Sequence, residues 1–150
     1  MKLFHIRGGF TFMEVLIVIA LLVGMTGLAI PFYQSFQVGS QLDNTTQELS
    51  QTLRRAQAKA MAVESLSAFG VHFESESFTV FEGTSYIPGD PINEVIPFTS
   101  AITITPAMGS EVVFSSLYGE TTHAGTITII ASNGASRILT INDLGVVDVN

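Results

Sequence analysis

Hydrophobic residues change their spacing twice along the chain. Residues 15–32 read VLIVIALLVGMTGLAIPF and contain no charged side chain. From residue 37 to 66, apolar residues recur at spacings of three, four and seven, which is typical of a helix with one buried face. This stripe comprises Val38, Leu42, Leu49, Leu53, Ala56, Ala60 and Val63. Together the two segments predict a single helix of about 55 residues.

After residue 68 the spacing changes to two, which predicts β-strands. The first two strands are expected at 69–73 and 78–81, with a turn at 74–77 and a loop rich in Pro and Gly at 83–94. Further strands are expected at 101–105, 111–115, 126–131, 137–141 and 146–149. Asn133-Gly134 predicts a hairpin, and Leu144-Gly145 predicts the last turn. The order of the elements predicts an α+β fold, in which the long helix packs on an antiparallel β-sheet or a small β-sandwich.

Residues 10–33 are long enough to cross a membrane. A helix rising about 1.5 Å per residue over this range would span a hydrocarbon core about 30 Å thick. Lys2 and Arg7 precede the segment, whereas the first charges beyond it are Asp43 and Glu48, so the amino terminus is expected in the cytoplasm. A cleavable secretory signal is the competing interpretation. The apolar run is longer than the usual core of such a signal, which favours the membrane helix.

Glu14 is the one acidic residue in this apolar segment. A carboxylate inside a membrane must be neutral, reach the interface or find a positive partner. If the chain were cut after Gly9, the new α-amine of Phe10 would lie one helical turn from Glu14 and supply that partner. The alternative, which charge placement alone leaves open, is an ordinary anchor whose acid reaches the headgroups.

The residues around Glu14 resemble a known processing site. Residues 7–14, RGGFTFME, followed by VLIVIALL resemble the leader junction of type IV prepilins and type II secretion pseudopilins. The resemblance implies cleavage after Gly9 by a prepilin peptidase and N-methylation of Phe10. It implies that Glu14 acts in assembly by pairing with the amine of a neighbouring subunit. The implied partners are other pilin or pseudopilin subunits and the inner-membrane assembly platform.

Helix-weakening residues lie in the second half of the apolar segment. Pro31 lacks the N–H that would bond to the carbonyl of Gly27, so a kink or local melting is expected there. Simple tolerance is the alternative, since membrane helices accept Gly and Pro. In the resembling filament subunits this stretch loosens on packing.

A second, carboxyl-terminal resemblance refines the domain organisation. Residues 125–147, GTITIIASNGASRILTINDLGVV, resemble the terminal hairpin and glycine turn of the GspH/FimT type of minor subunit. The expected organisation is a leader peptide at 1–9, a transmembrane or filament-core helix at 10–33, an amphipathic helix at 34–66 and a β-rich periplasmic domain at 67–150.

The charge balance argues against a nucleic-acid surface. Six Lys and Arg stand against 13 Asp and Glu, so the net charge is −7, and phosphate neutralisation needs cations. The alternative is a DNA-uptake minor pilin. Minor pilins of that kind bind DNA through arginines near their carboxyl terminus. Here Arg137 is the only cation after Lys59, and Asp143 and Asp148 follow it.

Catalytic, metal and cofactor sites are not expected. His5, His72 and His123 lack the spacing of a zinc site, and His72 and His123 are expected at the surface. The absence of Cys excludes disulfides, thiolate metal sites and cysteine nucleophiles. Asp90, Asn93 and Glu94 could offer oxygens to calcium, but a Pro- and Gly-rich turn has the same composition. An anchored hydrolase would need a serine activated by His72 or His123, and no serine-elbow motif is present.

The sequence therefore predicts a structural subunit rather than an enzyme. The precursor would be a single-pass inner-membrane protein with a periplasmic carboxyl-terminal domain. After trimming it would join a type II secretion pseudopilus or a type IV pilus near the tip, as a periplasmic or surface filament. The alternative is a membrane-anchored periplasmic binding domain that keeps residues 1–9 and does not polymerise.

Overall fold

The computed structural model describes residues 9–62 and 66–149; the side chains of residues 28–32 and 34 are not among those described. The chain divides into two units, Met1–Phe36 and Gln37–Asn150. The predicted leader at 1–9 lies outside the described residues except for Gly9.

Helix α1, Phe12–Met61, contributes residues to both units. Thr11 caps its amino terminus, because the Thr11 Oγ1 accepts a hydrogen bond of 3.2 Å from the Glu14 N–H. At the other end, the Leu117 N–H donates to the Ala60 carbonyl over 3.0 Å. The helix therefore ends at Met61 and not at residue 66, since a loop distant in sequence supplies the cap.

The predictions for the apolar part of α1 remain only partly tested. The helical assignment continues through Gly27 and Pro31 without a break, so no local melting is seen, and a kink at Pro31 stays a prediction. Within the described part of the chain, no helix is both long and apolar enough to cross a membrane. The predicted transmembrane segment at 10–33 is not confirmed.

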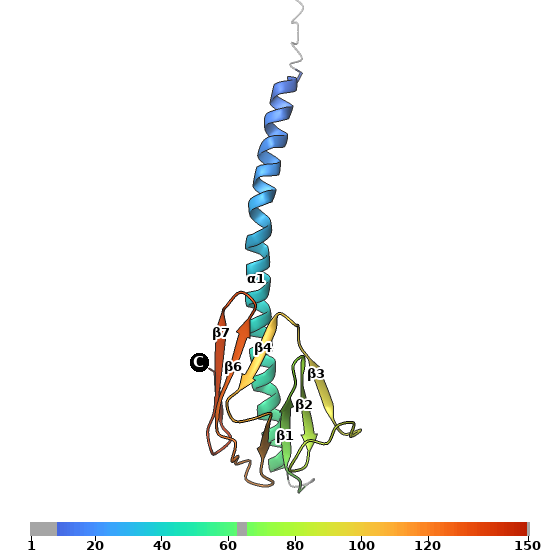
Figure 1. Ribbon diagram of the computed structural model, residues 1–150, viewed down its shortest axis with the longest axis vertical. Coiled ribbons are helices and arrows are strands. Elements are labelled where there is room, and N and C mark those ends of the chain that lie inside the picture. Colours follow the sequence, from blue (N-terminus) through green and yellow to red (C-terminus); the bar gives the residue numbers. More distant parts are fainter. Residues whose placement is uncertain (1–8, 63–65, 150) are drawn as a thin grey trace, which may run out of the picture. The chain divides into compact units, whose positions relative to one another are not determined.

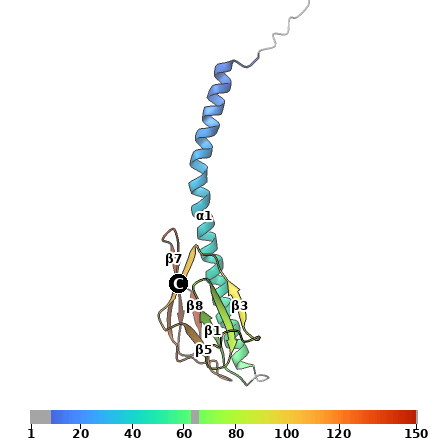
Figure 2. The same ribbon diagram turned by 45° about the vertical axis from the view of Figure 1, so that its right-hand side comes forward.

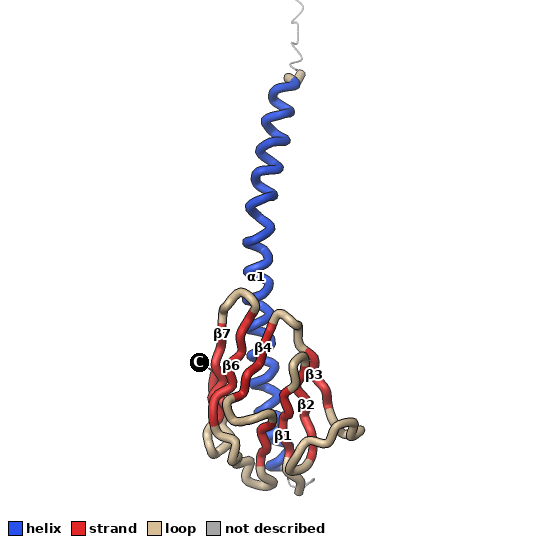
Figure 3. The backbone as a smooth tube through the Cα atoms, viewed as in Figure 1, coloured by secondary structure: helices blue, strands red, loops and turns tan. Residues whose placement is uncertain are grey.

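Eight strands follow the helix in the described residues, and they form two antiparallel sheets (Figures 1 and 3). The first sheet has the order β3-β2-β1-β5 and the second β4-β6-β7-β8. The bounds are β1 Phe69–Phe73, β2 Ser77–Glu82, β3 Glu94–Pro97, β4 Ile102–Pro106, β5 Glu111–Phe114, β6 Gly125–Ala131, β7 Ser136–Ile141 and β8 Val147–Val149. The α+β class with antiparallel pairing is confirmed.

The predicted strands are all present, with ends that shift by no more than one residue. The hairpin at Asn133-Gly134 joins β6 and β7, whose register pairs Ile130 with Ser136. One strand was missed: β3 occupies residues that the sequence assigned to the end of a loop and beyond. Because β3 has only four residues and ends in Pro97, its pairing with β2, and not its own pattern, makes it a strand.

One hydrophobic core joins the carboxyl-terminal part of α1 to both sheets. The helical stripe supplies Leu42, Leu49, Leu53, Ala56 and Ala60, all buried as predicted, with Val38 partly buried. Val63, also assigned to the stripe, lies outside the described residues. The sheets supply inward-facing residues at every second strand position, among them Val71, Phe78, Val80, Phe114, Ile127, Ile129, Leu139 and Ile141. The helix thus covers both sheets with one face.

Two consecutive arginines of α1 hold the outer edge strands of the two sheets. The Arg54 guanidinium donates to the Val147 carbonyl of β8 over 2.8 Å, and the Arg55 guanidinium lies 2.8 Å from the Glu94 carboxylate of β3. Neighbouring residues on a helix point about 100° apart, so one pair of side chains reaches both edges. Figure 1 shows β3 on the right of the domain and β7, which pairs with β8, on the left.

The turn that contains Gly145 packs against α1 at Gln57. The Gln57 Nε2 donates to the Gly119 and Leu144 carbonyls over 3.1 and 3.0 Å, which ties two loops to α1. Gly145 has φ of +76°, and a Cβ there would collide with the Gly119 carbonyl and the Gln57 amide. The predicted turn at Leu144-Gly145 therefore requires glycine for its conformation and for space.

Leu53→Ala should lower the free energy of unfolding of the domain by about 3 kcal/mol, because it removes a fully buried side chain from the core shared by both sheets. Chemical denaturation of the full chain in detergent measures this change. Gln51→Ala, at an exposed position on the same helix, is the matched control and should change the value by less than about 0.5 kcal/mol. Equal effects of the two substitutions would contradict the assigned core.

Gly145→Ala should destabilise the domain more than Gly134→Ala does. Both glycines have positive φ, but a Cβ at Gly134 meets nothing within 4 Å. Gly134→Ala should therefore lower the free energy of unfolding only through the strained backbone, by about 1 kcal/mol. Gly145→Ala should lower it by about 3 kcal/mol because of the added collision. Parallel denaturation curves test the order, and a smaller loss for Gly145→Ala would overturn it.

Candidate functional site

The amino-terminal unit exposes an unbroken apolar helix surface. Every large apolar side chain from Phe10 to Met25 is at least 45% exposed in the described structure, on all sides of α1. The Thr26 hydroxyl bonds back to the Leu22 and Val23 carbonyls, each over 3.0 Å, so it presents no free donor. A helix that is apolar all round needs a covering of lipid or of other helices.

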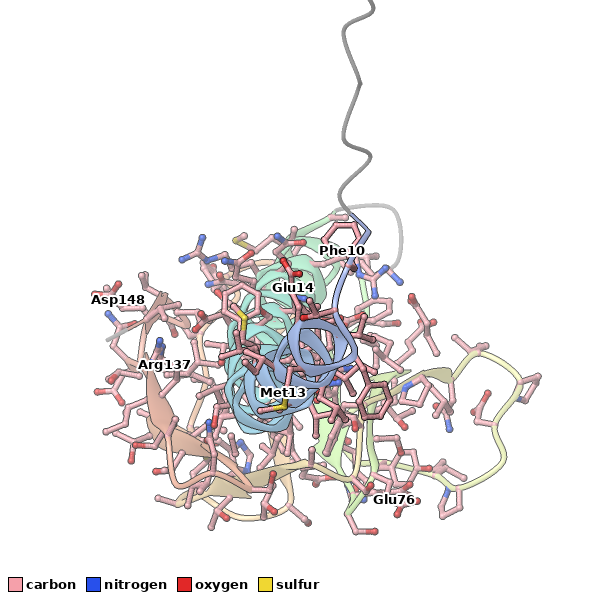
Figure 4. All side chains as sticks on the ribbon, turned by 90° about the horizontal axis from the view of Figure 1, so that it is seen from above. Phe10, Met13, Glu14, Glu76, Arg137 and Asp148 are labelled. Atoms are coloured by element: carbon pink, nitrogen blue, oxygen red, sulfur yellow. The ribbon has the colours of Figure 1, made fainter. Side chains whose placement is uncertain are left out.

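Glu14 is the exception on this surface. Its side chain is exposed in the first turn of α1, and no ion pair to it is found among the described residues. It lines a shallow hollow of about 250 Å³ together with Phe10, Val15, Val18 and Ile19. Figure 4 shows Glu14 on the same side of the helix as Phe10, whereas Met13 points elsewhere. A carboxylate beside these apolar side chains would need a cation if lipid or other helices covered the surface.

Gly9 and Phe10 precede the helix and lie in non-helical backbone. Phe10 is 83% exposed, and a Cβ at Gly9 would meet nothing within 4 Å. The peptide bond between them is therefore accessible, in a segment without regular hydrogen bonding. These are the properties that a peptidase substrate needs, and the cleavage itself stays a prediction.

The four cations after residue 9 lie in the domain, and each contacts another group. Arg54 and Arg55 have the edge-strand partners given above, the Lys59 Nζ lies 3.8 Å from Glu94, and the Arg137 guanidinium lies 2.9 Å from the Asp43 carboxylate. These side chains connect α1 to strands that are distant in sequence. Their arrangement serves the fold of the domain.

The three residues weighed as calcium ligands, Asp90, Asn93 and Glu94, each have a hydrogen-bond or ion-pair partner within the protein. The Asp90 Oδ1 accepts from the Ile92 N–H over 2.9 Å, and the Asn93 amide donates to the Ile87 carbonyl over 2.8 Å. Glu94 binds Arg55 and Lys59. Among the residues described, no cluster of three or more potential metal ligands is found. The loop uses its polar groups to hold its own shape.

The prediction that His72 and His123 are surface residues is met only in part. Both are half-buried, and the Nδ1 atom of each is buried without a hydrogen-bond partner. His72 is covered because the Tyr86 ring stacks on it, with centroids 4.1 Å apart and planes 10° apart. Sequence reasoning missed this contact because Tyr86 lies in a Pro- and Gly-rich stretch whose pattern predicts only a loop.

Comparisons with known proteins find no similar one: no family model, no curated protein and no solved structure matches the chain.

Proposed function

We propose that this chain is a pilin-like structural subunit, made as a membrane precursor, cut after Gly9, methylated on Phe10 and built into a filament through its apolar helix. The precursor is inserted in the inner membrane first, and the trimmed chain joins the filament afterwards. In detail, it is a minor subunit near the tip of a type II secretion pseudopilus or a type IV pilus. Prepilin peptidase, an inner-membrane assembly platform and neighbouring subunits are its partners.

The observation that carries the proposal is the lone carboxylate of Glu14 on an otherwise apolar helix surface. An uncompensated charge in such surroundings is expensive, on the order of a few kcal/mol. The α-amine of a trimmed chain supplies the missing cation only after the bond between Gly9 and Phe10 is broken. Assembly is then favoured by the covering of apolar side chains and by the neutralisation of Glu14.

Two further features support the proposal. The Gly9–Phe10 bond lies in exposed, non-helical chain directly before the helix cap at Thr11. One long helix followed by two antiparallel sheets is also the order of elements expected of a pilin-like subunit. The helix has one part with buried core residues and one part with exposed apolar residues, which suits a protein whose two parts pack against different surroundings.

A plain membrane anchor is the competing function, and the amino terminus of the mature protein separates the two. We expect mass spectrometry of the protein from its native host to find N-methyl-Phe10 as the first residue. Gly9→Val should block trimming by adding bulk at the cleaved bond, whereas Thr11→Ser, which keeps the helix cap, should be trimmed normally. Recovery of intact Met1 in assembled protein would refute the filament proposal.

Glu14→Ala should leave trimming and the folded domain unchanged but lower incorporation into filaments about tenfold or more, because the buried amine of a neighbour loses its counter-charge. Quantitative immunoblotting of sheared filaments measures incorporation, and Glu14→Gln should behave like Glu14→Ala. Met13→Leu, a neutral exchange at the adjacent exposed position, is the control. Normal incorporation of both Glu14 variants would exclude the pairing role.

A further inference from the structure

Two loops present large apolar side chains at the end of the domain where α1 ends (Figure 1). One loop follows β5 and contains Leu117 and Tyr118, and the other joins β7 to β8 and contains Leu144. Tyr118 is 75% exposed, Leu144 is 63% exposed, and Leu117 is exposed as well. We call these three residues the Tyr118 surface. Because loop residues are usually polar, apolar side chains on two neighbouring loops point to a contact with a partner.

The two loops lie against each other. The Gln57 amide of α1 donates to the Gly119 carbonyl of the first loop and to the Leu144 carbonyl of the second. The Thr121 N–H of the first loop donates to the Asp143 carbonyl of the second over 3.0 Å. The exposed apolar side chains therefore stand on loops that form one surface.

Each loop also has a fixed conformation of its own. In the first loop, the Gly119 N–H donates to the Ser115 carbonyl over 2.9 Å. In the second, the Val146 N–H donates to the Asn142 side chain over 2.9 Å. A surface that is ordered before binding loses little conformational entropy when a partner covers it.

The backbone of Leu117 gives a second indication that its side chain serves the surface. Leu117 has φ of +71°, a left-handed conformation that is unfavourable for a branched side chain and suits glycine. Its N–H caps α1 at the Ala60 carbonyl, and every residue type except proline could supply that N–H. The fold of the loop alone therefore does not explain a leucine at this position.

An acidic hollow of about 580 Å³ opens beside these apolar side chains. It is lined by Ser115, Glu120, Thr121, Thr122, Asp143 and Leu144. Leu144 belongs both to the hollow and to the Tyr118 surface, so a partner that covers the surface reaches the hollow. No ion pair or hydrogen bond to the carboxylate of Glu120 or Asp143 is found among the described residues.

These two carboxylates decide the charge of the partner. A partner that covers them removes water from both, which is unfavourable unless it supplies cations of its own. The four cations of this domain that follow residue 9 already contact other groups, and the whole chain has a net charge of −7. A basic partner is therefore attracted. An acidic protein, a nucleic acid or an anionic lipid surface is repelled.

We propose that the Tyr118 surface binds a segment of another protein in which Lys or Arg alternates with large apolar residues. The apolar side chains of the segment pack on Tyr118 and Leu144, and its cations enter the hollow beside Glu120 and Asp143. This inference rests on the domain alone, so it stands or fails independently of the proposed filament function.

A peptide titration of the labelled full chain in non-ionic detergent tests the docking surface. The probe is a hexapeptide of alternating Leu and Lys, and its matched control is a hexapeptide of alternating Leu and Glu. We expect the Leu–Lys peptide to shift the Tyr118 and Gly145 amide resonances and to bind about tenfold more tightly than the control. Added salt should reduce the difference between the two peptides.

Substitutions locate the binding on the two loops. Tyr118→Ser should weaken binding about fivefold or more, because it removes an exposed ring from the surface. Ile87→Ser, which replaces an exposed apolar side chain of the loop before β3, is its control and should bind like the wild type. Replacing both carboxylates, by Glu120→Gln with Asp143→Asn, should abolish the preference for the Leu–Lys peptide. Glu76→Gln, at an exposed acid in the β1–β2 turn, should keep it.

Leu117→Gly separates binding from folding. Glycine accepts the positive φ and keeps the N–H that caps α1, so the free energy of unfolding should not fall. Peptide binding should still weaken, since an apolar side chain is lost from the surface. This variant also decides the matter if Tyr118→Ser does not fold.

Three results of the peptide titration would overturn the proposal: equal affinity for the two peptides, shifts centred on other amides, or unchanged binding by Tyr118→Ser and Leu117→Gly. Shifts of the same amides that depend on protein concentration without any peptide would show that a second copy of the chain occupies the surface. That result would also refute the basic partner.

Discussion

The packing of one helical stripe against two sheets is the interaction on which the rest of the domain depends. Neither sheet has more than four strands, and both contribute their inward-facing residues to a core that α1 completes. Four-stranded sheets with one uncovered apolar face are not stable alone, so the helix makes the two sheets into one unit. Figure 2 shows β1, β3, β5 and β8 gathered around the lower part of the helix. Arg54 adds a hydrogen bond to a backbone carbonyl of the edge strand β8, and Arg55 adds an ion pair to a side chain of the edge strand β3.

The same helix has two parts with opposite surroundings. Near Leu49 and Leu53 the aliphatic side chains are fully buried, whereas near Leu21 and Leu22 side chains of the same type are exposed. Residue type does not explain this difference; the presence or absence of facing strands does. The exposed part is therefore the region that the proposed filament would cover, and Glu14 is the one charged residue in the sequence from residue 10 to residue 36. In the proposed filament, the same segment would have its apolar side chains covered by neighbouring subunits and its carboxylate paired with an amine.

The candidate assembly site could be predicted from the sequence because its parts are local. Gly9, Phe10 and Glu14 lie within six consecutive residues, with Glu14 in the first turn of α1 directly after the non-helical Gly9 and Phe10. The strands with alternating apolar residues were predictable for the same reason, since period two is a property of the strand itself. In contrast, β3 depends on pairing with β2, and the end of α1 depends on a cap donated by Leu117. Contacts between residues far apart in the chain leave no local signal.

The amino-acid sequence by itself determined the helix, the alternation of the strands, the two glycine turns and the placement of one carboxylate in an apolar run. All of these follow from the covalent order of neighbouring residues and from backbone geometry. Only the tertiary structure decided that consecutive arginines reach opposite sheet edges, that Tyr86 covers His72, and that Glu111 joins a loop to a strand 25 residues away. These contacts arise when the core closes and brings distant segments within a few ångströms of one another, so no pattern of near neighbours encodes them.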